Sequence, residues 1–580
     1  MESWTSSYWQ ENSKVCMDEF KKDDSWEKVP LINTTPHHLL KDGQLVRFRG
    51  MIQDMYNPVY YLATYEVLDT TTNQKIVRSG KYKDSLQCAE HEKVLFESDL
   101  TVNQERRPVY CISVPAVNDW AKCKKTDPRP DQIQGPRCAA GGVKRNVEDT
   151  NDTPDESPKV GSNEEQSKRL CSSRSETAVV GGTGMAMDTS SVEQTMDLNL
   201  PIPDSQAEAC LINFYDVEEG QLQINAVIEV AGFLSYDVAL VTSAVDGLDE
   251  PLPPPSLVPR LHAVAQRPVH FSNPLLTSQI TVDEVVANVP RLRDELKLVL
   301  TQLLLGDALA ADYLICHLIS RIYLRQDMLV LGKFSLNLSN IPDRSTAADY
   351  TFRLYQLLQT LLSKSHYLPI TLDNMNNINM IPKKNYETNR LESGLLQLSD
   401  KTHLVIDETM LEPGQLNDRG VRNCRALGSV ISNQRLEYDF QFYPVEFNTD
   451  IPVLILSEGK SMLPSDCHLP LEVDAACLAT VRETFAAATH YLREPLLSQL
   501  RVYLSLVSTA DYDLTPEVQQ IVQEDFVKMR QEQAKTSAQD LHSLLVLAKL
   551  LSLSQGARCL TKECWEMARQ MESKRKARIR

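Results

Sequence analysis

The pattern of hydrophobic and polar positions changes several times along the chain, and strand-like alternation dominates its first ordered region. The run LVRFRGMIQDM (45–55) alternates apolar and polar residues, and PVYYLATYEVL (58–68) is rich in aromatic and β-branched residues. Both features are typical of strands. We therefore predict a β-rich domain over 36–122, preceded by an N-terminal segment over 1–35.

A stretch without aromatic residues follows this domain. Between Trp120 and Phe214 the chain has no aromatic side chain and is rich in Pro, Gly, Ser, Thr and charged residues. Such a segment buries too little apolar area to offset its ordering entropy. We predict a disordered linker over 123–206, whose basic clusters KKTDPR and VKRNVED are either import signals or solvated linker.

Strand-like alternation returns in ACLINFYDVEEGQLQINAVIEVAGFLSYDVAL, which predicts a β-rich segment over 207–275 that contains a Pro-rich connector at 249–260. This segment is either a domain of its own or completes the N-terminal domain. The phrase VRFRGMIQD in the first β-rich region looks like the opening strand of an OB-like barrel, and a generic antiparallel sheet fits the same residues.

The period becomes helical from about residue 282, where Leu and Val recur at i, i+3 and i+4. Farther on, strand-like runs alternate with helical ones, at 328–338, 351–365, 403–411, 425–434, 438–447 and 451–459. This alternation predicts an α/β layered domain over 282–515. A helical lid that ends in the basic tail KRKARIR is predicted over 516–580.

Charge and composition narrow the classes of function. The chain has 60 basic and 78 acidic residues, and the net charge of -18 repels a phosphate backbone, so we expect no direct nucleic-acid binding. No apolar run is long enough to cross a bilayer, and the start has no apolar h-region. The 13 cysteines form no CxxC pair. We expect a soluble intracellular protein with reduced thiols, no membrane partner and no bound metal.

One segment has part of the pattern of a phosphate-binding loop. In LLLGDALAADYLICHLIS (303–320) an apolar run enters Gly306-Asp307 and continues into a helix, as such loops do. The lysine position is Asp312, which replaces an attraction of ~4 kcal/mol by a similar repulsion. The hydroxyl position is Tyr313. The segment is either a degenerate phosphate loop or an ordinary buried helix after a Gly-Asp turn.

A second segment ends an apolar strand in two acids. In HLVIDETML (403–411), Asp407 and Glu408 suit a Mg²⁺ ligand followed by a water-activating carboxylate, or the cap of a following helix. The sequence has neither a GxSxG elbow nor an HExxH helix. We therefore expect no catalytic residues and no cofactor.

Taken in order, these segments resemble the AAA+ module of the minichromosome-maintenance (MCM) helicase subunits. LLLGDALAADYLICHLIS is similar to their phosphate-loop helix, LVIDETML to their acidic strand, and VLILSEG to their sensor strand. The resemblance places Ser457 and Glu458 where the sensor Asn belongs, and Gln539 where the lid carries an arginine. The hairpin-like stretch 438–447 has no Lys or Arg for DNA. These departures imply a degenerate AAA+ module, a pseudo-ATPase fold retained for contacts.

Phrases over nearly the whole chain except the linker resemble the MCM complex-binding protein family, among them FRGMIQDM, LGKFSLNLS, NRLESGLLQL, SEGKSMLPSDC and QDLHSLLVLAKLLSLS. The resemblance implies a nuclear, non-enzymatic adaptor of DNA replication that binds MCM helicase subunits. It also implies a role in removing the MCM complex from chromatin late in S phase or in chaperoning free subunits. Sister-chromatid cohesion, and with it mitosis and cell division, would then be supported, and chromatin contact would be indirect.

Two alternatives of other classes stay open. The first is a single-stranded nucleic-acid-binding replication factor that acts through the OB-like domain, because cations and tyrosines lie near one another there as a stacking platform requires. These residues are Arg47, Arg49, Lys81, Lys83, Tyr60, Tyr61 and Tyr82. The second is a genuine ATPase with an unusual loop. The tail KRKARIR is an import signal or the solvated end of a helix.

Overall fold

The structure is a computed structural model of a mixed α/β protein. It describes residues 4–122, 197–218, 220–236, 258–269, 273–277, 279–326, 329–532 and 537–579. The linker predicted over 123–206, with both of its basic clusters, lies outside the described residues except for 197–206. None of the helices in the described part of the chain is long and apolar enough to span a bilayer.

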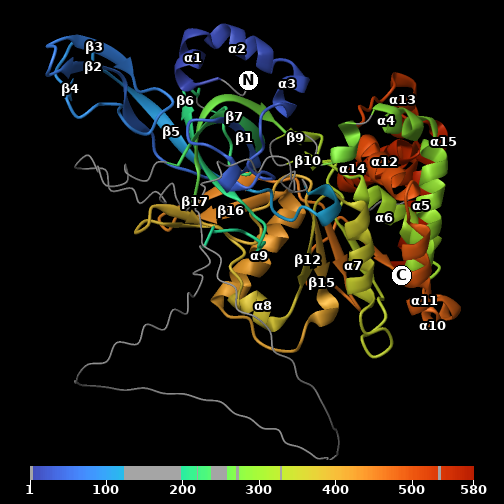
Figure 1. Ribbon diagram of the computed structural model, residues 1–580. Coiled ribbons are helices and arrows are strands. Elements are labelled where there is room, and N and C mark those ends of the chain that lie inside the picture. The colour runs from blue at the N-terminus through green and yellow to red at the C-terminus, as the bar shows by residue number, and fades with distance from the viewer. Residues whose placement is uncertain are drawn as a thin grey trace, which may run out of the picture. The chain divides into compact units, whose positions relative to one another are not determined.

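The two β-rich segments of the sequence form one sheet. Its strands are β1 (Leu45–Met55), β2 (Val59–Asp69), β3 (Lys75–Ser79), β4 (Glu92–Leu95), β5 (Val102–Ile112), β6 (Ala209–Tyr215), β7 (Val227–Ser235) and β8 (Arg260–Pro268). Five of them close a ring in the order β1-β5-β6-β8-β7-β1, in which β6 and β8 are parallel and the other pairs antiparallel. The remaining strands, β2, β3 and β4, extend from the ring as an arm (Figure 1).

Apolar residues that alternate along these strands fill the ring and cover one of its outer faces. Phe48, Ile52 and Ile212 belong to the core inside the sheet. On the other side, Trp9 packs edge-on against Phe233 at a centroid distance of 6.4 Å. Trp9 comes from the first of three short helices, α1 (Ser6–Glu11), α2 (Ser13–Phe20) and α3 (Asp23–Glu27). The N-terminal segment is therefore a helical cover for the sheet.

A parallel sheet forms the centre of the C-terminal part. Its strands are β11 (Leu336–Ser339), β12 (Ser365–Pro369), β15 (His403–Asp407), β18 (Val453–Leu456) and β19 (Cys467–Pro470), in the order β12-β15-β18-β11-β19. Val405 of β15 faces one hydrophobic core, and its neighbours Leu404 and Ile406 face another. Burial on both faces explains why these strands read as continuous apolar runs rather than as alternating ones.

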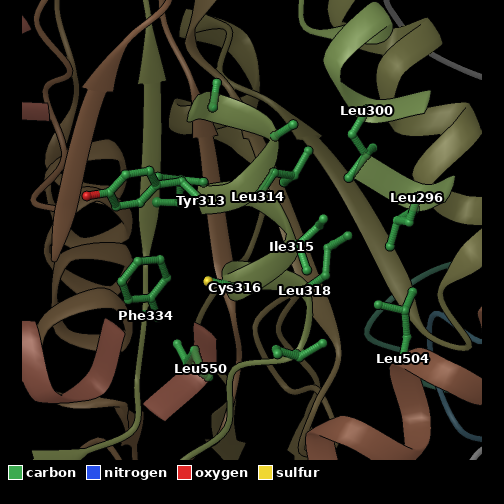
Figure 2. Packing of buried hydrophobic residues seen from close by; sticks show 14 of the residues in the cluster. Leu296, Leu300, Tyr313, Leu314, Ile315, Cys316, Leu318, Phe334, Leu504 and Leu550 are labelled. Atoms are coloured by element: carbon green, nitrogen blue, oxygen red, sulfur yellow. The ribbon is translucent and has the colours of Figure 1, made fainter. Parts of the chain in front are cut away.

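Helices cover both faces of this sheet and form a bundle beside it. α7 (Tyr350–Leu361) packs on one face and α9 (Asp418–Asn433) on the other. The bundle contains α4 (Gln279–Ala287), α5 (Val289–Leu303), α6 (Ala308–Leu318), α11 (Val481–Tyr491), α12 (Leu496–Thr509), α13 (Pro516–Glu532), α14 (Ala538–Ser554) and α15 (Lys562–Ile579). Figure 2 shows Leu314 and Ile315 of α6 near Leu300 of α5 and Leu504 of α12. α6 is apolar all round because other elements surround it.

Smaller elements complete the C-terminal part. Two strands, β9 (Leu324–Gln326) and β10 (Leu329–Leu331), form a hairpin. Four others form the sheet β14-β13-β16-β17, namely β13 (Lys383–Asn385), β14 (Arg390–Glu392), β16 (Arg435–Asp439) and β17 (Pro444–Asn448). Two short helices are α8 (Leu372–Asn377) and α10 (Ala475–Ala479). The single strand-like run predicted at 328–338 is divided between β10 and β11, because Gly332 turns the chain with a φ of 99°.

Buried hydrogen bonds join the N-terminal sheet to the C-terminal part. The side-chain amide of Gln53 donates to the carbonyl of Leu391 at 2.8 Å, and the Leu391 amide donates to the Asp54 carboxylate at 2.8 Å. Gln397 returns a bond of 2.9 Å to the carbonyl of Gln53. These contacts lie next to β14, far in sequence from β1, and they explain the burial of three polar side chains.

Candidate functional site at the carboxyl edge of the parallel sheet

The carboxyl ends of parallel strands are where α/β proteins bind ligands, and two of the predicted motifs meet there. Asp407 ends β15 and pairs in register with Leu456 of β18, whose next residue is Ser457. Leu338, near the end of β11, pairs with Leu456 from the other side. The acidic strand, the sensor strand and β11 are thus neighbours in the sheet.

Asp407 is fully buried, and its carboxylate already has four hydrogen-bond donors. Oδ1 accepts from the backbone N of Thr409 at 3.0 Å and from its Oγ1 at 2.7 Å. Oδ2 accepts from Oγ1 of Thr351 at 2.7 Å and from the hydroxyl of Tyr367. A carboxylate offers about four lone-pair positions. No position is left for a metal ion, and the carboxylate joins β15, β12 and α7 instead.

Glu408, the second acid, also has a partner within the protein. It is half-buried and accepts a hydrogen bond of 2.9 Å from Oγ of Ser461. Burial raises the pKa of the Glu408 carboxyl above its usual value, while Ser461 and two backbone amides oppose this rise. The side chain therefore holds the loop that follows β18.

The two predicted sensor residues differ in burial and in the atoms through which they make hydrogen bonds. Ser457 is buried, and its Oγ lies 3.0 Å from both Oδ1 of Asn337 and the carbonyl of Gly459. Glu458 is exposed, and its carbonyl accepts the backbone N–H of Asn340 at 3.1 Å. Both residues stabilise the turn where β18 and β11 end.

The predicted phosphate-loop turn does not follow a strand. Gly306 and Asp307 lie between α5 and α6, and Gly306 adopts a φ of 91°, which favours glycine. Asp307 caps α6 by accepting the Ala310 amide at 3.0 Å. It also accepts hydrogen bonds from both terminal nitrogens of Arg578, at 2.5 and 3.1 Å. The Asp307 side chain therefore already occupies the N-terminus of α6, where a phosphate would have to bind.

The two residues at the predicted lysine and hydroxyl positions are structural as well. Asp312 forms ion pairs of 2.7 Å with both Arg293 and Lys297 of α5. Tyr313 is fully buried, and its hydroxyl donates to Glu572 of α15 at 3.3 Å. Burial raises the pKa of this phenol.

The sheet has its strand–loop–helix unit elsewhere, at β11, residues 340–349 and α7. The phosphate-loop match was predicted at 303–320 instead, where AADY at 310–313 follows a Gly-Asp turn; the same string recurs at 347–350. In a phosphate loop a Lys and a Ser or Thr begin the helix. Here Tyr350 and Thr351 are the first two residues of α7. A hydroxyl residue after a buried strand was the available signal.

Several backbone amides of the loop at 340–349 already donate hydrogen bonds to other groups of the protein. The loop contains no glycine. The amides of Asn340 and Ile341 donate to the carbonyls of Glu458 and Ser457, and residue 342 is a proline without an N–H. The Thr346 amide donates to Asp343 Oδ1 at 2.8 Å. A phosphate cradle needs several free amides around one point, and these amides are already occupied.

Tyr350 replaces the cation that such a loop requires. It is 2% exposed, and its hydroxyl donates to the carbonyl of Leu303 at 2.8 Å. Burial raises the pKa of this phenol, so it stays uncharged.

Gln539 lies exposed in the first turn of α14 and borders a small cavity with Lys333 and Asp466. Within the described residues, no group of His, Cys, Asp and Glu could hold a metal ion.

The basic tail is part of α15 rather than a free extension. Arg575 donates to Glu572 and to the carbonyl of His468 at 2.8 Å. Arg578 pairs with Asp307 and with Glu472. These two cations are half-buried, whereas Lys574 is exposed.

The cations of the N-terminal sheet are also largely paired. Arg47 is 7% exposed and forms an ion pair of 2.8 Å with the fully buried Glu229. Arg49 pairs with the same carboxylate at 3.3 Å, and Lys81 pairs with Asp216. Lys83 donates to Gln87 at 2.7 Å.

The tyrosines near these cations are arranged mostly as packing residues. Tyr61 and Tyr82 both contact Tyr215 edge-on, at centroid distances of 5.1 and 4.9 Å. Tyr60 is 65% exposed. A continuous stack of open rings beside free cations is therefore not formed by the residues named in the sequence analysis.

Comparisons with known proteins agree over almost the full length of the chain. The family model for the mini-chromosome maintenance replisome factor matches residues 16–579. A mini-chromosome maintenance complex-binding protein from Drosophila melanogaster is 39% identical over 98% of this chain and 95% of its own length. Proteins of the same name from Salmo salar and Homo sapiens are 38% and 34% identical, each over 97% of this chain and 92% of their own length. The chain belongs to the family of the mini-chromosome maintenance replisome factor.

Proposed function

We propose that this protein is a non-enzymatic replication factor that binds subunits of the MCM complex. Its relatives are named for binding this complex, which supports the proposal. The observation that carries the non-enzymatic part is the Asp407 carboxylate, whose acceptor positions are all used within the protein. In the nucleus, such a factor would remove the MCM complex from chromatin late in S phase or chaperone its free subunits. Sister-chromatid cohesion would depend on that activity.

The C-terminal part, in this proposal, is a degenerate AAA+ module. The order β15-β18-β11 supports this, because it places the acidic strand, the sensor strand and the loop-bearing strand side by side. Thr351 and Asp407 still contact one another, as the hydroxyl and carboxylate around a Mg²⁺ ion would. The fold is retained and its polar groups now stabilise it.

Shape alone gives such a module a way to act. Subunits of a ring contact their neighbours through complementary faces. A protein with the shape of a subunit competes for one of these faces and adds no nucleotide chemistry of its own, so it prevents ring closure by mass action. The N-terminal ring, in this proposal, is an OB-type barrel. Its closed order with one parallel pair supports this.

The proposal is tested by mixing the purified full-length chain with each purified MCM subunit and following co-elution in size-exclusion chromatography. We expect at least one subunit to co-elute, with equal affinity in the presence and absence of magnesium ATP. The variant Glu458→Ala serves as a control, because it changes an exposed side chain at the carboxyl edge. It should co-elute with the same subunit as the natural chain. Failure of every subunit to co-elute contradicts binding.

The non-enzymatic part is tested separately by titrating magnesium ATP into the chain alone. Binding that requires magnesium and is lost in Asp407→Asn contradicts the non-enzymatic part of the proposal.

The nucleic-acid alternative predicts affinity for single-stranded DNA that falls steeply with salt. We expect no such affinity, since Arg47 and Arg49 are paired with Glu229.

A further inference from the structure

The amino edge of the parallel sheet borders a cavity that the proposed function does not use. The cavity has a volume of about 540 Å³. Its walls are the start of β15 at His403, the residues around Lys364 before β12, the end of α12 around Ser505, and the turn of the N-terminal sheet at 225–227. This volume is within the range of small-molecule sites, roughly 300 to 1,000 Å³.

Three cationic side chains line this cavity, with one carboxylate, Asp400. They are Arg321, Lys364 and Lys401. Among the residues that the structure describes, none of the three forms an ion pair, whereas Lys333, Arg575 and Arg578 near the same sheet each pair with a carboxylate. Lys364 is buried, and a buried charge is normally matched by a carboxylate because an unpaired one is costly.

The hydrogen bonds of these cations leave donors unused. Nζ of Lys364 donates to Oγ of Ser399 at 2.8 Å and to the carbonyl of Asp400 at 2.6 Å, which leaves its third hydrogen. Among the described residues, the one hydrogen bond of the Arg321 side chain is its donation to the carbonyl of Ala510, at 3.3 Å. The side chain of Lys401 makes no hydrogen bond within the described residues.

A buried histidine in the same wall has an unsatisfied nitrogen. His403 is 8% exposed, and its Nδ1 has no hydrogen-bond partner. Burial, with the charges of His317 and Lys364, holds the pKa of this imidazole well below its usual value. The ring is therefore neutral and has one donor and one acceptor. Buried polar atoms without partners are rare in folded proteins, and a ligand is one explanation for such an atom.

The cations that line the cavity also repel one another. Burial lowers the pKa of Lys364 to about 8, with a further contribution from Lys401, while Asp400 and Asp450 oppose the shift. Burial and the charge of Arg321 also lower the pKa of Lys401, and Asp450 and Asp400 oppose this shift too. An anion bound among the three groups would relieve this repulsion.

We propose that the cavity binds a small phosphate-bearing molecule, with Arg321, Lys364 and Lys401 as its cationic contacts and His403 as a hydrogen-bond partner. A guanidinium and two ammonium groups suit the several oxygens of a phosphate, which carries up to two negative charges. The cavity has room for more than one phosphate group. The proposal is independent of MCM binding.

Pyrophosphate and inorganic phosphate are the probes, titrated into the full-length chain by isothermal calorimetry without magnesium and at constant ionic strength. We expect saturable binding, with pyrophosphate the tighter ligand. Lys364→Met and Arg321→Met should each weaken it by about tenfold or more. Lys460→Met is the matched control, because Lys460 is exposed at the opposite edge of the sheet, and it should leave affinity unchanged.

Lys401→Met provides a second variant if Lys364→Met does not fold, since the Lys401 side chain has no hydrogen bond to lose. Absence of saturable binding in the natural chain overturns the proposal, and so does an equal loss of affinity in Lys460→Met. A ligand that binds at the carboxyl edge would instead depend on magnesium and on Asp407. The failure of this proposal can therefore be told apart from the failure of the proposed function.

Discussion

The two edges of one parallel sheet use polar residues in opposite ways. At the carboxyl edge, Asp407 has four hydrogen-bond donors and Asp307 is paired with Arg578. At the amino edge, Lys364 and Lys401 line a cavity without an ion pair among the described residues. The carboxyl edge is the one whose sequence looks like a catalytic site. The comparison teaches that unused donors and acceptors, more than residue type, distinguish a binding edge from a structural one.

The largest effect is expected at the carboxyl edge, from Asp407→Ala. The change removes the acceptor of the Thr351, Tyr367 and Thr409 side chains and leaves buried donors unsatisfied. The free energy of unfolding should fall by about 4 kcal/mol, as when one partner of a buried charged network is removed. Urea unfolding at neutral pH measures the loss.

The control for this prediction is Glu458→Ala, which removes an exposed acid at the same edge. It should change the free energy of unfolding by less than about 0.5 kcal/mol. A loss of stability in Asp407→Ala as small as that of the control would mean that the carboxylate is not structural. It would then be available to a ligand, and the contrast between the edges would fail.

The next largest effect is expected in the pH dependence of the free energy of unfolding, through the titration of Lys364. The folded chain holds the pKa of this lysine at about 8, below its usual value of 10.5, so the unfolded chain binds the proton more tightly. The natural chain should therefore gain stability relative to Lys364→Met as pH rises from about 8 to about 10.5, by about 3 kcal/mol in total.

Urea unfolding of both chains across that pH range measures this difference. The comparison with the variant cancels the titration of tyrosines and of other lysines. A difference that stays constant with pH would show that Lys364 titrates normally, and the amino edge would then resemble an ordinary solvated surface.

A smaller loss is expected when the basic tail is released from the carboxyl edge. Arg578→Ala removes the pair with the buried Asp307 and the contact with the carbonyl of Pro470. We expect a loss of about 2 kcal/mol in the free energy of unfolding, because the Asp307 carboxylate keeps its two amide donors.

Thermal unfolding of Arg578→Ala beside Lys574→Ala provides the comparison, since Lys574 lies exposed in the same helix. Equal melting temperatures of the two variants would show that the tail is held in place by helix formation alone.

The smallest effect is expected from Gln539→Arg, which introduces a cation where the resemblance to AAA+ modules places the lid arginine. The melting temperature in magnesium ATP should match that of the natural chain. The reason is that the Asp407 oxygens and the loop amides at 340–341 already have partners. A shift that needs both magnesium and the new arginine would show that the carboxyl edge can still open for a nucleotide.

Local patterns were enough to predict several elements. The alternation in 45–55 predicted β1, and the apolar run before Asp407 predicted β15. The hairpin-like stretch 438–447 falls in β16 and β17. These features depend on neighbours in sequence, so periodicity and turn residues contain the information. The family resemblance also came from the sequence, because it rests on phrases spread over most of the chain.

The position of the loop-bearing strand was decided only by the fold. The sequence match to a phosphate loop was placed at 303–320, which contains AADY after a Gly-Asp turn, and the same string recurs at 347–350. The structure surrounds the first copy with helices and places the second at the start of α7, after β11. Which helix follows a strand of the sheet depends on long-range pairing, and local composition does not encode it.

The sequence by itself determined the strands and helices with a clear local pattern, such as β1 and β15, and the family of this chain. The tertiary structure decided which polar residues are satisfied. Asp407 finds its donors on β12 and α7, and the cavity assembles Lys364 with the turn at 225–227 and Ser505. Hydrogen bonds and charge pairs form between residues far apart in sequence. Whether a carboxylate or an ammonium is free for a ligand is therefore fixed only when the chain has packed.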